Sequence, residues 1–294
     1  MTKPQLGFIG LGLMGQALTA HLTECGYQVT GYDIDGTKVE RAGDHGVVRA
    51  FSSAEVAEAS DIVLMCVVST DAVEQAVFGD AGVAIGGSAG KVLVDHSTTI
   101  VSNTKDMARQ LKTLCGMGWV DAPVSGGPPA ARSGSLAIMA GGEPGDIAKV
   151  EPVMADISGG FTHFGAVGAG QVAKMVNQIL VLNNYAVLAE ALALAEAGGI
   201  DARKIPEALA SGHAGSNMLK NVFPRMIERD FEPQGYARQI LKDFDMLHDL
   251  AKTLKSPTPM SSQATSLFRI LCSKGHQELD GISVLKLFDQ NETV

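Results

Sequence analysis

The first half of the chain alternates short apolar runs with helical stretches, and this alternation limits the possible folds more than any other feature of the sequence. Apolar runs of this length are typical of strands, and helices between them are typical of βαβ units on a mostly parallel sheet. The strand-like runs cover residues 6–9, 28–32, 62–67, 92–95, 118–122 and 137–140. The helical stretches cover residues 13–24, 53–59, 72–77, 102–114 and 147–157.

The pattern changes after residue 165, where glycine spacers precede a long helical stretch that ends at Gly198. No convincing strand returns, and further helical stretches cover residues 202–210, 217–229, 234–255, 260–274 and 282–288. We therefore predict an α/β fold with two domains. A doubly wound sheet is expected over residues 1–165 and an all-α domain over residues 166–294, joined by the long interdomain helix.

The charge balance of the chain excludes several kinds of partner. The sequence has 294 residues, of which 23 are basic and 32 acidic, so the formal net charge is −9. Nucleic-acid binding needs a basic face, so we expect no nucleic-acid partner. Because 46% of the residues are hydrophobic and only 19% are charged, intrinsic disorder is also excluded. If the chain binds an anion, the attraction must be local.

The cysteines and the apolar stretches predict a cytoplasmic protein. Four cysteines are scattered without a C-x-x-C pair, which argues against a metal site or a disulfide framework. The start of the chain shows no pattern of a secretory signal. The most apolar long stretch, residues 175–198, is interrupted by Asn, Gln and Glu, so we expect a buried helix and no membrane partner.

A glycine turn lies between the first strand-like run and the first helical stretch. Gly10, Gly12 and Gly15 form a G-x-G-x-x-G pattern, and Leu13 and Met14 open the helical stretch within it. Between a strand and a helix, this pattern is typical of a Rossmann-type dinucleotide-binding domain. The three glycines permit a tight turn, the approach of a pyrophosphate to the backbone, and close helix–strand packing. The free N–H groups at the helix start would attract the anion without a basic residue.

An acidic residue ends the second strand-like run. Asp33 lies 18 residues after Gly15, close to the spacing of the ribose-binding carboxylate in such domains. A carboxylate there would bind the ribose hydroxyls and repel a 2′-phosphate, and no Arg follows before Arg41. This favours NAD over NADP, with NADP possible. The alternative is a solvated Asp, since Asp35 and Lys38 are near in sequence.

Three polar residues share one face near the start of the long helix. Lys174, Asn177 and Gln178 are three and four residues apart on an otherwise apolar stretch. One reading is that these groups satisfy one another, or nearby backbone, between the domains. The other is catalytic: the helix dipole and partial burial disfavour the ammonium form of Lys174, which would then exchange a proton with a carbonyl oxygen. The amides would hold the hydroxyl and carboxylate of a substrate.

A second glycine turn follows the strand-like run at residues 118–122. Ser125, Gly126 and Gly127 offer a hydroxyl and exposed backbone N–H groups, which suit a small carboxylate. The alternative reading is an ordinary structural turn.

Several segments occur in register along essentially the whole chain. They are GFIGLGLMG at residues 7–15, DHSTT at 95–99, DAPVSGG at 121–127, GAGQVAKMVNQ at 168–178, and the pair Lys242-Asp243. Together they resemble the β-hydroxyacid dehydrogenase family, which includes 3-hydroxyisobutyrate dehydrogenase and tartronate semialdehyde reductase.

The resemblance implies roles for individual residues. Lys174 would be catalytic, and Ser125, Gly126, Gly127 and Asn177 would contact the substrate. Lys242 would lie near the nicotinamide. Further cofactor contacts would come from the first glycine turn, Val67, Val68 and Thr98. Val68 stands where the family usually has Pro or Asn, so this contact is expected only through the backbone.

The resemblance also implies an activity. The chain would be an NAD(P)-dependent oxidoreductase that interconverts a small 3-hydroxy acid and its semialdehyde or 3-oxo acid. Residues 212–219 and 230–233, with Pro224 and Met226, resemble the tartronate semialdehyde reductase branch, which favours tartronate semialdehyde and D-glycerate as substrates. Alternatives are 3-hydroxyisobutyrate or another 3-hydroxy acid, an imine reductase, or a non-catalytic dinucleotide-binding module. The family forms dimers and tetramers, so a homodimer or homotetramer is expected.

Overall fold

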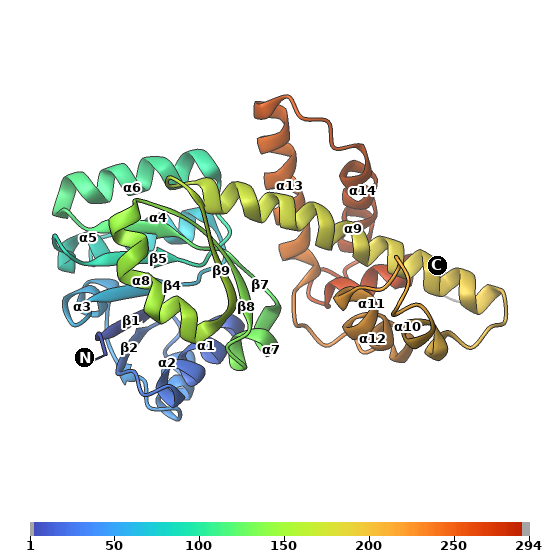
Figure 1. Cartoon of the computed structure of the whole chain (residues 1–294), viewed down its shortest axis with the longest axis horizontal. Helices are drawn as coiled ribbons and strands as arrows, with labels where there is room; N and C mark the ends of the chain where they lie inside the picture. Colours follow the sequence, from blue (N-terminus) through green and yellow to red (C-terminus); the bar gives the residue numbers. More distant parts are fainter. Residues whose placement is uncertain (1–2, 290–294) are drawn as a thin grey trace. The chain divides into compact units, whose positions relative to one another are not determined.

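The computed structural model describes residues 3–289 and divides the chain into two compact units. The first unit ends at Lys174 and the second begins at Met175, so the division falls inside the long helix α9 (Ala169–Ala197). Figure 1 shows the first unit in blue to green and the second in yellow to red. The functional boundary after residue 165 stays a prediction.

A nine-stranded sheet forms the centre of the first unit. Its strand order is β3-β2-β1-β4-β5-β6-β8-β7, and β9 pairs with β8 off this path. The strands from β3 to β6 run parallel, whereas β8 is antiparallel to β6 and β7. The strands are β1 (Leu6–Ile9), β2 (Val29–Tyr32), β3 (Val48–Arg49), β4 (Ile62–Met65), β5 (Val92–Asp95), β6 (Gly118–Asp121), β7 (Val124–Ser125), β8 (Leu136–Gly142) and β9 (Ser158–Gly165).

Helices cover both faces of this sheet, because alternate side chains of each buried strand point to opposite sides. Phe8, Leu64 and Val94 belong to a core with α1, α2 and α8, whereas Val63 and Leu93 belong to a core with α3, α4, α5 and α6. The doubly wound sheet is thereby confirmed. The helices of this unit are α1 (Leu13–Glu24), α2 (Gly36–Gly43), α3 (Ser53–Glu58), α4 (Thr70–Phe78), α5 (Val83–Gly86), α6 (Val101–Cys115), α7 (Gly127–Arg132) and α8 (Pro144–Ile157).

Several elements of the first unit are not among those predicted from the sequence. Strands β3 and β7 have two residues each, too few for a periodic pattern. Strand β9 is largely exposed and contains three glycines, so it lacks the apolar composition that marks a buried strand. It forms instead because its backbone pairs with β8. Helices α2, α5 and α7 were also not expected.

The second unit is helical, as predicted. In the described part of this unit the one β pairing is a single bridge between Tyr236 and Asp280. Residues 217–229, expected as one helix, form two, because Pro224 starts a new helix after Val222. The elements are η1 (Ala202–Lys204), α10 (Ile205–Ala208), α11 (Asn217–Asn221), α12 (Phe223–Glu228), α13 (Ala237–Leu254), α14 (Pro259–Ser273) and the 3₁₀ helix η2 (Gly281–Leu287).

Helix α9 supplies much of the core of the second unit. Leu182, Ala189 and Leu192 are buried there against the surrounding helices. Among residues 3–289, α9 alone is long and apolar enough to cross a membrane by length and composition, and 39% of its most apolar window is buried within the protein. A core helix of a soluble protein has the same properties, so this finding is weak support for a membrane span.

Candidate active site

The first glycine turn leaves room for a ligand at one glycine and none at the other two. Gly10 has φ +90°, and a Cβ added there would collide with the carbonyl oxygen of Cys66. A Cβ at Gly15 would collide with the carbonyl oxygen of Gly10. A Cβ at Gly12 would meet nothing within 4 Å. Gly12 therefore faces open space beside a tightly closed turn, which fits the approach of a dinucleotide pyrophosphate.

The start of α1 adds hydrogen-bond donors to this turn. Gly12 is the N-cap of α1, and no described side chain caps the helix. The first N–H groups of a helix have no partner within it, so those of Leu13 and Met14 are suited to an anion. The positive end of α1 thus supplies the local attraction that the net charge of −9 does not.

Asp33 follows directly after β2 and holds the glycine turn in place. Its Oδ2 accepts a hydrogen bond from the backbone N–H of Leu11 at 2.7 Å, and its Oδ1 accepts one from Asp35 at 2.9 Å. The ammonium of Lys38 lies 3.5 Å from Oδ1, and the Asp33 side chain is only 8% exposed. The carboxylate therefore shapes the turn in addition to its predicted role toward the ribose.

A cation that sequence spacing did not reveal lies near the same loop. Arg49 on β3 pairs in register with Gly31 on β2. Its Nη2 lies 3.9 Å from where a Cβ of Gly36 would stand, at the start of α2. The pairing of β3 with β2 brings Arg49 close to the segment after Asp33, although the two residues are 16 positions apart in the sequence. Spacing along the chain therefore gives no sign of this cation.

The other predicted cofactor contacts follow the ends of β4, which pairs with β1, and of β5, which pairs with β4. The backbone N–H of Val67 donates to Ser97 Oγ at 2.9 Å, which joins the two loops. Thr98 lies in the loop after β5 and is half-buried, and Val68 is 61% exposed. In parallel sheets, ligands bind beyond the carboxyl ends of the strands, and these residues occupy that edge.

His96 joins the ends of β5 and β6. Its Nδ1 lies 2.7 Å from the carbonyl oxygen of Ala122 and, with this partner, acts as the donor. The side chain is buried, and burial lowers the pKa of His96 to about 4. A neutral, buried imidazole therefore contacts the backbone of Ala122, three residues before Ser125. The sequence prediction assigned this residue no role.

The second glycine turn contains backbone that only glycine adopts readily. Ser125 is the last residue of β7 and pairs with Ala137. Gly126 has φ +126° and Gly127 has φ +68°, both in the region that disfavours side chains. Gly126 is exposed and Ser125 is half-buried. The hydroxyl and the glycine backbone are thus accessible together.

Lys174 lies beside this second turn. Its side chain is buried, with 8% of the residue exposed, and its Nζ donates a hydrogen bond to the carbonyl oxygen of Val124 at 2.7 Å. Val124 directly precedes Ser125. Residues 50 positions apart, on α9 and β7, thereby bring an amine to the backbone of the residue that precedes Ser125.

Asp121 and Gln171, which were not predicted as site residues, support this arrangement. Asp121 is fully buried at the end of β6, and its carboxylate accepts hydrogen bonds from the N–H groups of Gly168 and Gln171 at the start of α9. Burial raises the pKa of Asp121 to about 6, and these hydrogen bonds oppose the rise. Their isolated sequence positions give no sign of this contact.

In the second unit, the predicted amides form a hydrogen-bonded chain. Asn177 Nδ2 donates to Gln178 Oε1 at 3.0 Å, and Gln178 Nε2 donates to the carboxylate of Asp243. The ammonium of Lys242 lies 3.2 Å from the other oxygen of Asp243. Asn177 and Gln178 therefore satisfy each other in part, as one of the two readings of the sequence anticipated, and Asp243 links them to Lys242.

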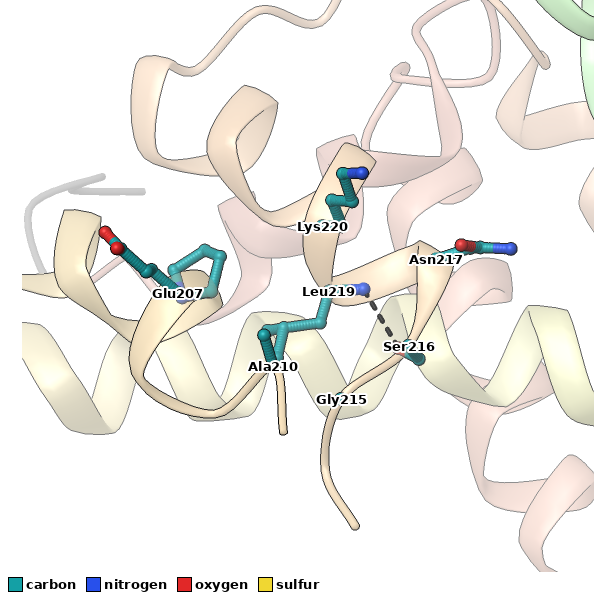
Figure 2. Close-up of a pocket in the computed structure, with 8 residues that line it drawn as sticks. Glu207, Ala210, Gly215, Ser216, Asn217, Leu219 and Lys220 are labelled. Carbon is teal, nitrogen blue, oxygen red and sulfur yellow. Dashed lines mark hydrogen bonds between the residues drawn. The ribbon is translucent and has the colours of Figure 1, made fainter. Parts of the chain in front are cut away.

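A separate pocket in the second unit contains none of the predicted catalytic, substrate-binding or cofactor-binding residues, although part of its lining lies within residues 212–219. Figure 2 shows its lining, which comes from α10, α11 and the loop between them. Ser216 Oγ in this pocket accepts a hydrogen bond from the N–H of Leu219 and so caps α11. Within residues 3–289, no group of three His, Cys, Asp or Glu side chains could hold a metal ion.

Comparisons with known proteins agree with this geometry. Residues 5–168 match the NAD-binding domain of 6-phosphogluconate dehydrogenase, and residues 168–288 match the NAD-binding family of NADP-dependent 3-hydroxyisobutyrate dehydrogenase. The chain is 34% identical to 2-hydroxy-3-oxopropionate reductase of Escherichia coli, over 97% of each chain. It is 32% identical to L-threonate dehydrogenase of Cupriavidus necator, over 96% of this chain and 95% of that one.

Similarity extends to solved structures. A crystal structure of 3-hydroxyisobutyrate dehydrogenase from Salmonella typhimurium superposes with a TM-score of 0.88 at 27% identity, covering 97% of this chain and 100% of that one. The two family matches and these relatives show that the chain is an NAD(P)-dependent oxidoreductase that acts on CH–OH groups. The chain belongs to the β-hydroxyacid dehydrogenase family.

Proposed function

We propose that this protein interconverts a small 3-hydroxy acid and its semialdehyde or 3-oxo acid, with Lys174 as the general acid and base. The observation that carries the proposal is the buried amine of Lys174, hydrogen-bonded at 2.7 Å to Val124 beside the Ser125 turn. A buried amine held at the turn that carries Ser125 could exchange a proton with a hydroxy acid bound there.

The proton and the hydride travel separately in this reaction. Bound NAD(P) supplies the hydride for reduction of the carbonyl or accepts it during oxidation of the alcohol. During oxidation, the neutral amine of Lys174 takes the hydroxyl proton as the C–H bond breaks. During reduction, the ammonium of Lys174 gives that proton to the carbonyl oxygen.

The substrate would be held by its carboxylate and its hydroxyl. Ser125 Oγ and the N–H groups of Gly126 and Gly127 would bind the carboxylate, because positive φ angles open this backbone to an anion. Asn177 and Gln178 would contribute amide groups, since they follow Lys174 by three and four residues on α9.

The cofactor would lie along the carboxyl edge of the sheet in the first unit. Gly10, Gly12, Gly15 and the N–H groups of Leu13 and Met14 would bind its pyrophosphate, and Asp33 its ribose. Val67, Val68 and Thr98 would line the adjoining strand ends, and Lys242 would contact the nicotinamide end. The carboxylate of Asp33 favours NAD over NADP.

The best candidate for the substrate pair is tartronate semialdehyde and D-glycerate. This choice rests on residues 212–219 and 230–233 and on the 34% identity to a protein named 2-hydroxy-3-oxopropionate reductase. L-threonate and 3-hydroxyisobutyrate are the competing candidates, because the chain is also similar to L-threonate dehydrogenase and to 3-hydroxyisobutyrate dehydrogenase.

A substrate panel tests the proposal. The protein is mixed with NAD⁺ or NADP⁺ and with D-glycerate, 3-hydroxyisobutyrate, L-threonate or L-serine, and the absorbance of the reduced nicotinamide is followed. We expect the highest kcat/KM with D-glycerate and NAD⁺. A higher kcat/KM for another acid would mean that this acid is the substrate, and the proposed reaction class would be unchanged. Tight cofactor binding without turnover of any acid would indicate a non-catalytic dinucleotide-binding module.

We also propose that the protein is a cytoplasmic homodimer or homotetramer. Val176, Leu180, Val187 and Leu194 are each at least half exposed and lie on one face of α9, because their spacing returns to the same side of the helix. Such an apolar stripe is suited to burial against another copy of the chain. The proposed location in the cytoplasm is supported by the described cysteines, which form no disulfide and so suit a reducing compartment.

A further inference from the structure

The start of α9 is attached to the sheet by a buried carboxylate that lies outside the helix itself. Asp121, the last residue of β6, is fully buried. Its Oδ1 accepts from the N–H of Gly168 at 2.7 Å, and its Oδ2 accepts from the N–H of Gln171 at 2.9 Å. Gly168 directly precedes α9 and Gln171 is in its first turn, where N–H groups have no partner within the helix.

The carboxylate has no cationic partner among its described contacts. Its charge is balanced by backbone N–H groups and by the positive end of a 29-residue helix. Burial raises the pKa of Asp121 to about 6, which shows how strongly desolvation acts on this group. Helix α9 is therefore fastened to β6 at a point where loss of the carboxylate would leave buried donors unsatisfied.

Glycine on both sides allows this close approach. A Cβ at Gly170 would lie 2.5 Å from the carbonyl oxygens of both Asp121 and Met139. A Cβ at Gly141 on β8 would lie 2.7 Å from Asp121 Oδ1 and 2.8 Å from the carbonyl oxygen of Ala166. The start of α9 thus lies directly against the backbone of β6 and β8, and neither glycine can be replaced without moving the helix.

Gln171 provides a second attachment, to the loop after β5. Its side chain is fully buried. Oε1 accepts from the N–H of Thr99 at 3.1 Å, and Nε2 donates to the carbonyl oxygen of Ser97 at 2.8 Å. Both polar ends of the amide are therefore used to fix the first turn of α9 on the sheet edge.

These attachments control where the amine of Lys174 lies. Lys174 is one helical turn after Gln171, and its Nζ reaches the carbonyl oxygen of Val124. Val124 follows Asp121 by three residues on the chain that leaves β6. One carboxylate thus joins the segment that carries the amine to the segment that carries Ser125. All of these residues belong to the first unit.

We propose that Asp121, together with Gln171, is a positioning residue that fixes Lys174 against the Val124–Gly127 turn. The inference rests on the proposed function of Lys174 and adds the reason why its amine stays in place. Asp121 itself touches neither substrate nor cofactor in this proposal. Its loss should affect the proton-transfer step and leave the cofactor site of β1 and α1 intact.

The test uses the full-length protein with the substitution Asp121→Asn, which has the same shape. An amide offers one acceptor where two N–H groups must be bound, and its NH₂ group would face a second donor. With the panel acid of highest kcat/KM, we expect kcat to fall at least tenfold. The Kd for NADH, measured by fluorescence titration, should stay within twofold. A kcat within twofold of wild type would overturn the proposal.

Asp280→Asn is the matched control. Asp280 is also buried, 1% exposed, and its Oδ2 accepts from the N–H groups of Gln234 and Gly235 in the second unit. We expect this substitution to lower the Tm without changing kcat by more than twofold. An equal fall of kcat in both variants would mean that general loss of stability, and no positioning of Lys174, explains the effect.

Two further measurements separate this proposal from that for Lys174. In Asp121→Asn, hydrogen exchange of the amides of residues 168–171 should be faster than in wild type; unchanged exchange would overturn the attachment itself. In a Lys174→Ala background, Asp121→Asn should change the residual kcat less than twofold. An undiminished effect there would show that Asp121 acts through another group.

If Lys174→Ala alone kept normal turnover, the proposed function would be wrong, whereas faster hydrogen exchange in Asp121→Asn would still support the attachment of α9.

If Asp121→Asn does not fold, Gln171→Met is used as the test variant. Methionine has a similar shape and cannot form the hydrogen bonds to Thr99 and Ser97. We expect Gln171→Met to lower kcat at least fivefold, and an unchanged kcat would overturn the proposal.

Discussion

Directly after β2, the Asp33 carboxylate holds the glycine turn, in addition to the role toward a ribose that the sequence predicts for it. Its hydrogen bond to Leu11 fixes the loop, and Lys38 lies near its other oxygen. The sequence spacing identified Asp33 but could not reveal this bond, because it joins residues 22 apart in the chain. Arg49 and His96 could not be predicted for the same reason. Sheet pairing brings Arg49 next to β2, and a tertiary contact joins His96 to Ala122.

Replacing Asp33 should change the cofactor preference. We expect Asp33→Ala to lower the ratio of kcat/KM for NAD⁺ to that for NADP⁺, because repulsion of a 2′-phosphate is lost while Lys38 and Arg49 remain. Loss of the hydrogen bond to Leu11 should also cost about 1 kcal/mol of stability. Steady-state kinetics with both cofactors measures the ratio, and an unchanged ratio would remove Asp33 as the selector.

His96 should make the protein less stable in mild acid. Burial holds its folded-state pKa at about 4, below the usual value of 6.5, so the unfolded chain binds more protons between these pH values. The stability should therefore decrease as the pH falls from about 6.5 to 4, by on the order of 1 kcal/mol per pH unit. Urea unfolding across this range, compared between wild type and His96→Asn, measures the contribution.

Asparagine at position 96 can keep a donor toward Ala122 but cannot titrate. The difference in unfolding free energy between the two proteins should thus change with pH in the window below 6.5. A difference that is constant from pH 6.5 to 4 would contradict the assignment of His96 as a buried neutral imidazole.

At the scale of elements, the β1–α1 turn was predictable because its signals are local. The glycine pattern, the strand before it and the helix after it lie within about twenty residues, and each has its own composition signal. Strands β7 and β9 were not predictable, because two residues carry no period and an exposed, glycine-rich strand has no apolar pattern. Their pairing with β8 is a property of the assembled sheet.

Two glycines of this turn should respond differently to the same substitution. Gly12→Ala adds a Cβ into open space at an ordinary φ of −72°, so the Tm should change little while the Kd for NADH rises at least tenfold. Gly15→Ala places a Cβ against the carbonyl oxygen of Gly10, so the Tm should fall by several degrees. Thermal unfolding and fluorescence titration measure the two effects. A Gly12→Ala variant with normal cofactor affinity would contradict the pyrophosphate assignment.

For the whole molecule, the two-part architecture could be predicted because strand and helix patterns change near residue 165. The boundary between the compact units could not be predicted, because α9 continues past Lys174 without a break in its sequence pattern. The acidic net charge is compatible with anion binding because backbone N–H groups at α1 and at the second glycine turn act locally.

The exposed apolar stripe of α9 leads to a prediction about assembly. We expect wild-type protein to have the mass of a dimer or tetramer by light scattering after size exclusion. Leu180→Glu combined with Leu194→Glu should shift it toward the monomer, because charges would be buried in the contact. Leu114→Glu, on a leucine of α6 that is 60% exposed, serves as control. A monomeric wild type would rule out this interface.

The most direct test of the central claim is the kcat of Lys174→Ala with the preferred hydroxy acid and NAD⁺. General acid–base catalysis contributes about 10²–10⁴-fold, so kcat should fall by that factor. The Kd for NADH should stay within a few-fold of wild type, because the glycine turn of β1 and α1 is untouched. A Lys174→Ala variant that keeps a near-normal kcat would contradict the account.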